Sequence, residues 1–120
     1  MSKYVDGFVI PISKKNVEKY KEIAQKAGEI WKEYGALEYY ECVGDDLEIE
    51  NMLSFRKIAD ASEGETVIFA WIVFGSREDR DKVNAAVMAD PRIKDSMVPG
   101  DTPFDFKRMA YGGFTTLVAI

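Results

Sequence analysis

The sequence contains no histidine. Histidine is the side chain whose charge changes nearest neutral pH, and it supplies the base of Ser-His-Asp and Cys-His catalytic groups. Its absence excludes those groups, histidine-ligated haem and zinc sites that need imidazole. Any reaction must therefore use carboxylates, tyrosine, lysine or arginine, and we expect neither a cofactor nor a metal.

Cysteine is almost absent as well. The one cysteine, Cys42, cannot form an internal disulfide. This favours a reducing compartment, so we expect a cytoplasmic protein. No histidine is available to activate the thiol, and a lone cysteine in a strand usually packs as a small hydrophobic side chain. We therefore interpret Cys42 as a packing residue, with a reactive thiol as the alternative.

Positive charge and long apolar runs are also scarce. The 16 lysines and arginines are outnumbered by 21 aspartates and glutamates, which gives a formal net charge of −5. Nucleic acids and anionic membranes select clustered positive charge, so neither is expected as a partner. No stretch approaches the roughly 20 apolar residues that span a bilayer, and residues 1–12 lack the long apolar core of a signal peptide.

What the sequence does contain is enough apolar side chain for one core. Its 120 residues are 47% hydrophobic and 31% charged, an ordinary composition for a globular protein. A chain of this length buries one core rather than two. We therefore expect a single domain over residues 1–120.

The first half of the chain shows a strand, a helix and a second strand. Residues 4–12 are apolar on both faces, as in a covered strand. Apolar side chains then recur at steps of three and four residues, which predicts a helix with Ser13 as its N-cap and Gly35 at its end. Residues 37–43 are predicted to form a strand with mixed faces. Within the polar segment 45–65, both an extended hairpin and a short helical turn remain open.

The second half shows a strand, a helix and a last strand. Residues 67–74 are all apolar and are predicted to form a strand covered on both sides. A helix is expected to begin after Ser76, which can cap it, and to end before Pro91. Residues 97–110 are predicted to form a loop, of a length that often carries function, and residues 111–120 the last strand.

The order strand, helix, strand, strand, helix, strand predicts an α+β protein with the ferredoxin-like fold, whose two helices cover one face of an antiparallel sheet. The other face is then uncovered, yet residues 67–74 present apolar side chains to both faces. Leaving such side chains in water forgoes about 1.5–3 kcal/mol each. We therefore expect a homodimer in which a second copy covers the open face.

Short motifs spread over nearly the whole chain are similar to those of a known family. They are Tyr4-Val5-Asp6-Gly7-Phe8, Gly35-Ala36-Leu37, Glu41-Cys42, Ser54-Phe55, Trp71, Arg80-Asp81, Met88, Asp90-Pro91-Arg92, and Pro103-Phe104-Asp105 through Lys107-Arg108-Met109 to Tyr111-Gly112-Gly113-Phe114. The chain resembles the YbaA-like bacterial proteins, a family of unknown function in the dimeric α+β-barrel superfamily. The resemblance implies a ferredoxin-like dimer that closes an α+β barrel, but no reaction.

Two positions depart from the pattern of that family. Thr102 stands where methionine is usual, and Phe106 stands where glycine is usual. Replacing a conformationally permissive glycine by a bulky aromatic residue changes the loop geometry that the resemblance implies.

Asp6 is the residue that fits its surroundings least well. It lies in a strand expected at the centre of the sheet, on the same face as Phe8 and Ile10. An unpaired carboxylate is costly there, so Asp6 is either paired or functional. In the ferredoxin-like order the start of the first strand lies beside the start of the second helix, so Arg80 is the predicted partner.

The function predicted from these residues is the binding or oxidation of a small aromatic or acidic metabolite in a pocket between sheet and helices. Asp6 and Tyr111 are the catalytic candidates, and Trp71, Phe104 and Arg108 are the candidates for binding the ligand. A non-catalytic dimeric binding or interaction module is the alternative. Whether the protein is an enzyme stays open, because superfamily membership alone decides no activity.

Two further groups of side chains favour structural readings. Five aromatic residues can line a pocket but have the spacing of core residues: Tyr20, Trp31, Tyr34, Phe55 and Trp71. The acidic residues between positions 45 and 50 lack the spacing and the glycine of a calcium-binding loop, so we expect a solvated surface there.

Overall fold

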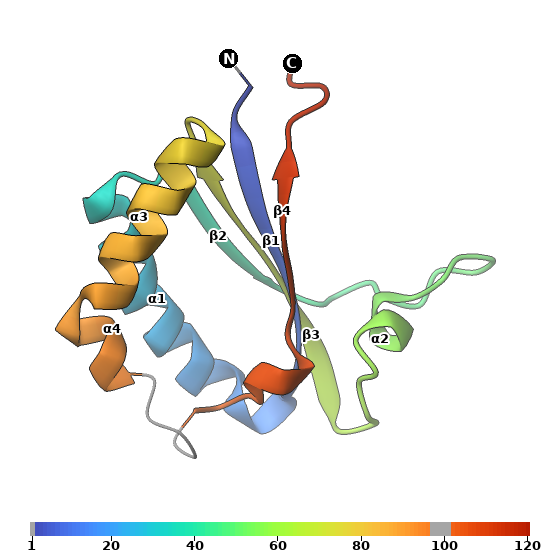
Figure 1. Cartoon of the computed structure of the whole chain (residues 1–120). Helices are drawn as coiled ribbons and strands as arrows, with labels where there is room; N and C mark the ends of the chain where they lie inside the picture. Colours follow the sequence, from blue (N-terminus) through green and yellow to red (C-terminus); the bar gives the residue numbers. More distant parts are fainter. Residues whose placement is uncertain (1, 97–101) are drawn as a thin grey trace.

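The computed structural model describes residues 2–96 and 102–120, which build a four-stranded antiparallel sheet in the order β2-β3-β1-β4. The strands are β1 Tyr4–Ser13, β2 Glu38–Val43, β3 Glu65–Phe74 and β4 Ala110–Thr115. Figure 1 shows α1, α3 and α4 on one face of this sheet and α2 beside the other. The predicted ferredoxin-like α+β fold is confirmed.

The helices begin and end mostly where the sequence predicts. They are α1 Val17–Tyr34, α2 Phe55–Ile58, α3 Arg77–Ala89 and α4 Pro91–Ser96, with 3₁₀ turns η1 Lys14–Asn16 and η2 Phe106–Arg108. α1 ends at Gly35, whose φ of 122° suits a residue without a side chain. α3 begins at Ser76, whose hydroxyl accepts a hydrogen bond from the backbone N–H of Asp79 at 3.1 Å, as predicted.

Ser13 does not cap a helix through its side chain, so that prediction was wrong. β1 continues through Ser13, and η1 separates it from α1. The open question in segment 45–65 is answered by α2, a single helical turn capped by Ser54, which accepts from the N–H of Lys57.

Within the described residues, no helix is long and apolar enough to cross a membrane.

A short helix after Pro91 was missed. Proline ends α3 but suits the first position of α4, where its missing N–H has no partner to lose. The carboxylate of Asp90 accepts from the N–H of Arg92 at 2.8 Å and supports this start. Of the predicted loop 97–110, residues 97–101 lie outside the described residues.

The last strand is shorter than predicted. β4 ends at Thr115, which pairs with Tyr4, the first residue of β1, and one further backbone hydrogen bond follows, from the N–H of Thr116 to the carbonyl of Lys3 at 3.1 Å. The apolar side chains of Leu117, Val118 and Ile120 follow the strand and are exposed. Residues 116–120 are therefore not part of the sheet, contrary to the prediction of a strand over 111–120.

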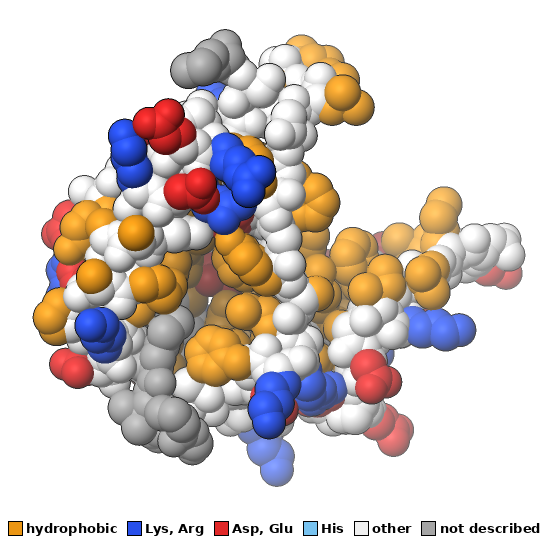
Figure 2. Space-filling model, viewed as in Figure 1, with side chains coloured by type: hydrophobic (Ala, Val, Ile, Leu, Met, Phe, Trp, Pro, Cys, Tyr) orange, Lys and Arg blue, Asp and Glu red, His pale blue; other side chains and the backbone are white. Residues whose placement is uncertain are grey.

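The two faces of the sheet differ in what covers them. On the helix face, alternate residues of β1 and β3 build the core: Tyr4, Ile10, Ile12, Ile68, Ala70, Ile72 and Phe74. On the open face, Trp71 stacks on Tyr40 with ring centroids 4.9 Å apart, and Phe69 meets Phe55 of α2 at 5.6 Å. Figure 2 shows hydrophobic side chains gathered between β4 and the α2 segment. β3 is thus apolar on both faces, as predicted.

Candidate functional site

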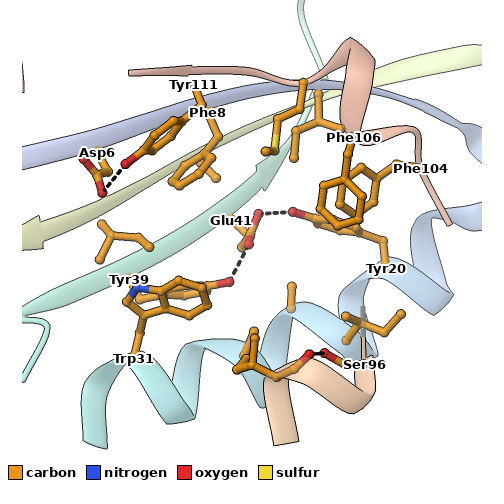
Figure 3. A pocket seen from close by; sticks show the side chains of 18 of the residues that line it. Asp6, Phe8, Tyr20, Trp31, Tyr39, Glu41, Ser96, Phe104, Phe106 and Tyr111 are labelled. Carbon is orange, nitrogen blue, oxygen red and sulfur yellow. Dashed lines mark hydrogen bonds between the residues drawn. The ribbon is translucent and has the colours of Figure 1, made fainter. Parts of the chain in front are cut away.

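A cavity of about 310 Å³ lies between the helix face of the sheet and the helices (Figure 3). Its wall is mainly apolar, with side chains that include Phe8, Ile10, Ala24, Ala27, Ala70 and Ile72. Its size is at the lower end of the range of pockets that hold small molecules. Two carboxylates, those of Asp6 and Glu41, interrupt this apolar surface.

Asp6 is buried, with 1% of its surface exposed. β1 places it on the helix face, where the Nε of Arg80 lies 3.4 Å from Oδ1. Oδ2 accepts hydrogen bonds from the hydroxyl of Tyr111 at 3.1 Å and from the side-chain amide of Asn84 at 3.3 Å. The predicted pairing of Asp6 with Arg80 is therefore present.

Arg80 and Asn84 tie this carboxylate to neighbouring aromatic residues. The guanidinium of Arg80 lies over the ring of Tyr4, 4.9 Å from its centroid, and donates to its hydroxyl at 3.1 Å. The amide oxygen of Asn84 accepts from the indole N–H of Trp31 at 3.0 Å. Asp6 thus belongs to a hydrogen-bonded network that joins β1, α1, α3 and β4, which is the arrangement of a structural ion pair.

Glu41 has a different set of partners. Its Oε1 accepts from the hydroxyl of Tyr20 on α1, and its Oε2 accepts from the hydroxyl of Tyr39 on β2, both at 2.6 Å. Figure 3 shows its carboxylate between these two rings, on the cavity side of the sheet. Among the described residues, no lysine or arginine forms an ion pair with Glu41.

Burial and the two tyrosine partners act in opposite directions on the pKa of Glu41, and burial has the larger effect. Burial raises its pKa above the ordinary value of a glutamate, and the two tyrosine hydrogen bonds only partly oppose this. The pKa values of Tyr20 and Tyr39 are raised as well, first by their burial and then by the carboxylate beside them. Both phenols therefore stay protonated over the physiological range and keep donating to Glu41.

A glycine in α1 makes room for one of these phenols. A Cβ added at Gly28 would lie only 2.6 Å from the ring of Tyr39. A side chain at this position would push the ring away from the helix or distort the helix itself. The close approach of α1 to β2 at Gly28 therefore sets where the hydroxyl of Tyr39 meets Glu41.

Aromatic residues of the last loop line the cavity as well. Phe104 meets Tyr20 edge to face at 5.5 Å and Phe106 at 4.7 Å. The side-chain amide of Asn16 donates to the carbonyl of Pro103 at 3.1 Å and holds this segment against the start of α1. Phe106, which replaces the glycine expected from the family pattern, begins the 3₁₀ turn η2 and lines the cavity.

Three of the five predicted site residues lie in the wall of the cavity and two do not. Asp6, Tyr111 and Phe104 line it. Trp71 lies on the open face, stacked on a tyrosine ring. Arg108 lies at the surface, where its guanidinium binds the carboxylate of Glu65 at 2.8 and 2.9 Å and holds the pKa of that carboxyl at about 2. Ligand contacts of these five residues stay predictions.

The five aromatic residues singled out in the sequence are also divided between the cavity wall and other parts of the structure. Tyr20 and Trp31 line the cavity, whereas Phe55 packs on the open face and Tyr34 donates to the carboxylate of Asp90. Glu41 was missed as a site residue. Its signal is the one that identified Asp6, a carboxylate alternating with apolar side chains on one face of a strand. Among the described residues, no cluster of acidic or cysteine side chains could hold a metal ion.

The fold is shared with solved structures that have little sequence in common with this chain. A NIPSNAP family protein of unknown function from Agrobacterium tumefaciens superposes with a TM-score of 0.57 at 14% identity, covering 95% of this chain and 87% of its own. An uncharacterized NIPSNAP domain protein from Burkholderia xenovorans gives 0.53 at 13% identity, covering 92% and 91%. At this identity the likeness shows the fold alone.

Sequence comparison is more specific. The model of a family described as a protein of unknown function, DUF1428, matches residues 3–106. Uncharacterized protein YbaA of Escherichia coli K12 is 43% identical over 117 residues, which cover 97% of each chain, and YbaA of Shigella flexneri matches equally. The chain therefore belongs to the DUF1428 family, and the resemblance to YbaA-like proteins is confirmed.

Proposed function

We propose that the protein binds a small neutral aromatic molecule in the cavity between sheet and helices. The observation that supports this most directly is a set of aromatic rings that line a small apolar space: Phe8, Trp31, Phe104, Phe106 and Tyr111. Aromatic side chains prefer ring partners at about 4.5–7 Å. A ligand ring can find such partners on several sides of this cavity.

The charges in the cavity favour a neutral ligand over an acidic one. The two ionisable side chains that interrupt the apolar wall most deeply, Asp6 and Glu41, are acids. The guanidinium of Arg80 is already held by Asp6 and Tyr4. An anionic ligand would enter an apolar space beside two carboxylates, where its desolvation is uncompensated.

Trp31 provides a direct test of binding. Trp71→Phe removes the tryptophan of the open face and leaves Trp31, in the cavity wall, as the one remaining of the two tryptophans. We expect tetralin, a neutral bicyclic aromatic, to change the emission of Trp31 in this variant, and benzoate to change it much less.

Blocking the cavity should abolish the response. Ala27→Leu, introduced together with Trp71→Phe, places three more carbon atoms in the cavity from α1, and we expect the emission change with tetralin to disappear. Ala85→Leu on the exposed side of α3 is the matched control and should leave the change intact. An unchanged response in the Ala27→Leu variant would contradict binding in this cavity.

The open face supports a second proposal, that the protein is a homodimer. Tyr40, Phe69 and Phe114 lie on this face and are 51%, 44% and 61% exposed. Large aromatic side chains in one exposed patch indicate an interface. A two-fold axis would bring two copies of this mainly apolar surface together. A single exposed cysteine without a disulfide partner is consistent with a cytoplasmic location.

The molar mass in solution tests the dimer. Light scattering after gel filtration should give about twice the 13.6 kDa of the chain, and a mass near 13.6 kDa across micromolar concentrations would contradict the dimer. Phe114→Glu should yield folded monomer, whereas Ala85→Glu, which adds the same charge on α3, should not. A dimer that binds no aromatic molecule in the tetralin titration favours the alternative, a non-catalytic interaction module.

A further inference from the structure

Glu41 is a buried carboxylate whose negative charge does not stabilise the fold. It is largely buried, its partners are two neutral phenols, and no cation compensates its charge among the described residues. Asp6, by contrast, has Arg80 at 3.4 Å. Buried charges in proteins are ordinarily paired, and uncompensated ones are found where a reaction or a ligand needs them.

The geometry leaves Glu41 able to accept a proton. Each carboxylate oxygen can accept two hydrogen bonds, and each oxygen of Glu41 accepts one, from Tyr20 or from Tyr39. The remaining lone pairs belong to a group that lines the cavity. The two phenols fix the carboxylate from opposite sides, so its position does not depend on the ligand.

We propose that Glu41 is a catalytic base that takes a proton from the carbon next to the carbonyl of an aromatic ketone bound in this cavity. The proposal rests on the proposed function, since the ketone is the neutral aromatic ligand. In the step the C–H bond breaks, the proton bonds to a Glu41 oxygen, and the electron pair forms a C=C bond while the carbonyl oxygen gains the negative charge. The product is an enolate, and no oxidant or metal takes part.

The phenols have a part in the same step. Before proton transfer the negative charge lies on Glu41, and Tyr20 and Tyr39 donate to it. After transfer Glu41 is neutral and the charge lies on the enolate oxygen, so a phenol that turns toward that oxygen follows the charge. If a solvent deuteron replaces the proton on Glu41 before the carbon is reprotonated, the C–H hydrogen is exchanged, and protonation of the oxygen or of another carbon instead isomerises the ketone. Hydrogen bonds at a developing negative charge are a main source of rate enhancement.

Proton exchange detected by NMR tests the proposal. 2-Tetralone, an aromatic ketone with exchangeable protons beside the carbonyl, is incubated with the protein in D₂O, and the loss of its C–H signals is followed. We expect the wild-type protein to accelerate the loss by about 10²–10⁴-fold, the range of general base catalysis. Glu41→Gln should reduce the rate to the level without protein.

The matched control is Glu38→Gln, three residues before Glu41 on the same strand but on the open face, where Glu38 pairs with Val73. It should exchange 2-tetralone as fast as wild type. Glu41→Asp, which withdraws the carboxylate by one methylene, should fold like wild type and exchange more slowly, which keeps the test decisive if Glu41→Gln fails to fold.

The two measurements, ligand binding and proton exchange, distinguish failure of the proposed function from failure of the inference. Tetralin has the rings of 2-tetralone without the carbonyl. If both molecules bind and wild type and Glu41→Gln exchange 2-tetralone at the same rate, the inference is overturned and the proposed function stands. If tetralin binds but 2-tetralone does not, the inference is again overturned. If neither binds, both the proposed function and the inference fail.

Discussion

Two carboxylates line the same cavity and are held in opposite ways. Asp6 is fully buried beside the guanidinium of Arg80, with Tyr111 and Asn84 both donating to Oδ2, while Oδ1 has the guanidinium at 3.4 Å but accepts no hydrogen bond. Glu41 is held by two phenols and no cation, and its pKa is raised by burial. A buried charge with a cation contributes to one stable arrangement, whereas a buried charge without one retains affinity for a proton. We therefore expect a structural role for Asp6, and the proposed catalytic role belongs to Glu41.

The largest expected effect is at Asp6. Asp6→Asn leaves the largely buried guanidinium of Arg80 with only the exposed carboxylate of Asp81 beside it, so we expect the free energy of unfolding to fall by about 3–5 kcal/mol. Arg80→Met should have a similar effect, because it leaves the carboxylate alone, and the double variant should recover part of the loss. Urea unfolding of the three variants measures this.

Asp81 provides the control for that experiment. Its carboxylate also lies 3.4 Å from the guanidinium of Arg80, but its side chain is 58% exposed. Asp81→Asn should therefore cost less than about 1 kcal/mol. Losses at Asp6 and Arg80 that simply add in the double variant would show that the two side chains do not act as a pair.

The tyrosines should show the next largest effect. Removing a hydrogen bond to a charged group costs about 1.5–3 kcal/mol. Tyr39→Phe leaves Glu41 with one hydrogen bond and should lie near the upper end of this range. Tyr111→Phe leaves Asp6 with Arg80 and Asn84 and should lie near or below the lower end. Thermal unfolding measures the loss of stability in the two variants. Equal losses would show that Glu41 does not depend on its tyrosine partners more than Asp6 does.

Glu41→Gln should change the free energy of unfolding by less than the tyrosine variants do, and in the opposite direction. Because the folded-state pKa of Glu41 is raised, the proton it binds in the folded protein stabilises the fold below the unfolded value of about 4.3. This stability is lost as the pH rises through the folded-state pKa. Glutamine carries no such charge, so we expect the variant to be more stable than wild type at pH 8.

The pH dependence identifies the cause of that difference. Chemical unfolding at a series of pH values should show wild type and Glu41→Gln converging near pH 4. A variant that is less stable than wild type at every pH would mean that Glu41 has mainly a structural role in joining α1 to β2.

An exposed pair should show the smallest effect. The pKa of Glu65 is lowered to about 2 by Arg108, so the pair stabilises the fold above the unfolded pKa of about 4.3 and this stability is lost as the pH falls toward 2. The guanidinium is partly exposed to water, so Glu65→Gln should cost at most about 1 kcal/mol at neutral pH. High salt should reduce the cost further. A loss as large as that at Asp6 would show that burial is not what separates these pairs.

The sequence predicted Asp6 and its partner for reasons that the structure bears out. Alternation along β1 placed a carboxylate among apolar side chains, and the order of elements placed the start of α3 beside it. Both arguments use backbone geometry alone. They do not depend on which side chains surround the pair.

The residues whose surroundings sequence reasoning did not predict share one cause. β3 is apolar on both faces, so the pattern alone could not tell that the row containing Ile72 faces the helices and the row containing Trp71 does not. β2 resembled an edge strand with mixed faces, which hid Glu41. Arg108 is a candidate for binding the ligand, and the sequence did not identify its ion-pair partner Glu65, which is 43 residues away. Which face is covered, and which charges meet, are properties of packing.

Gly28 contributes no functional atom, yet it lies against the ring of Tyr39. Alanine at a helix interior is ordinarily favoured over glycine by about 1 kcal/mol. At this position the exchange would displace a phenol that holds Glu41. A substitution at this helix position in a relative would therefore change the cavity even if every acid and every phenol is the same. Identical polar residues alone do not show that two members of the family share an activity.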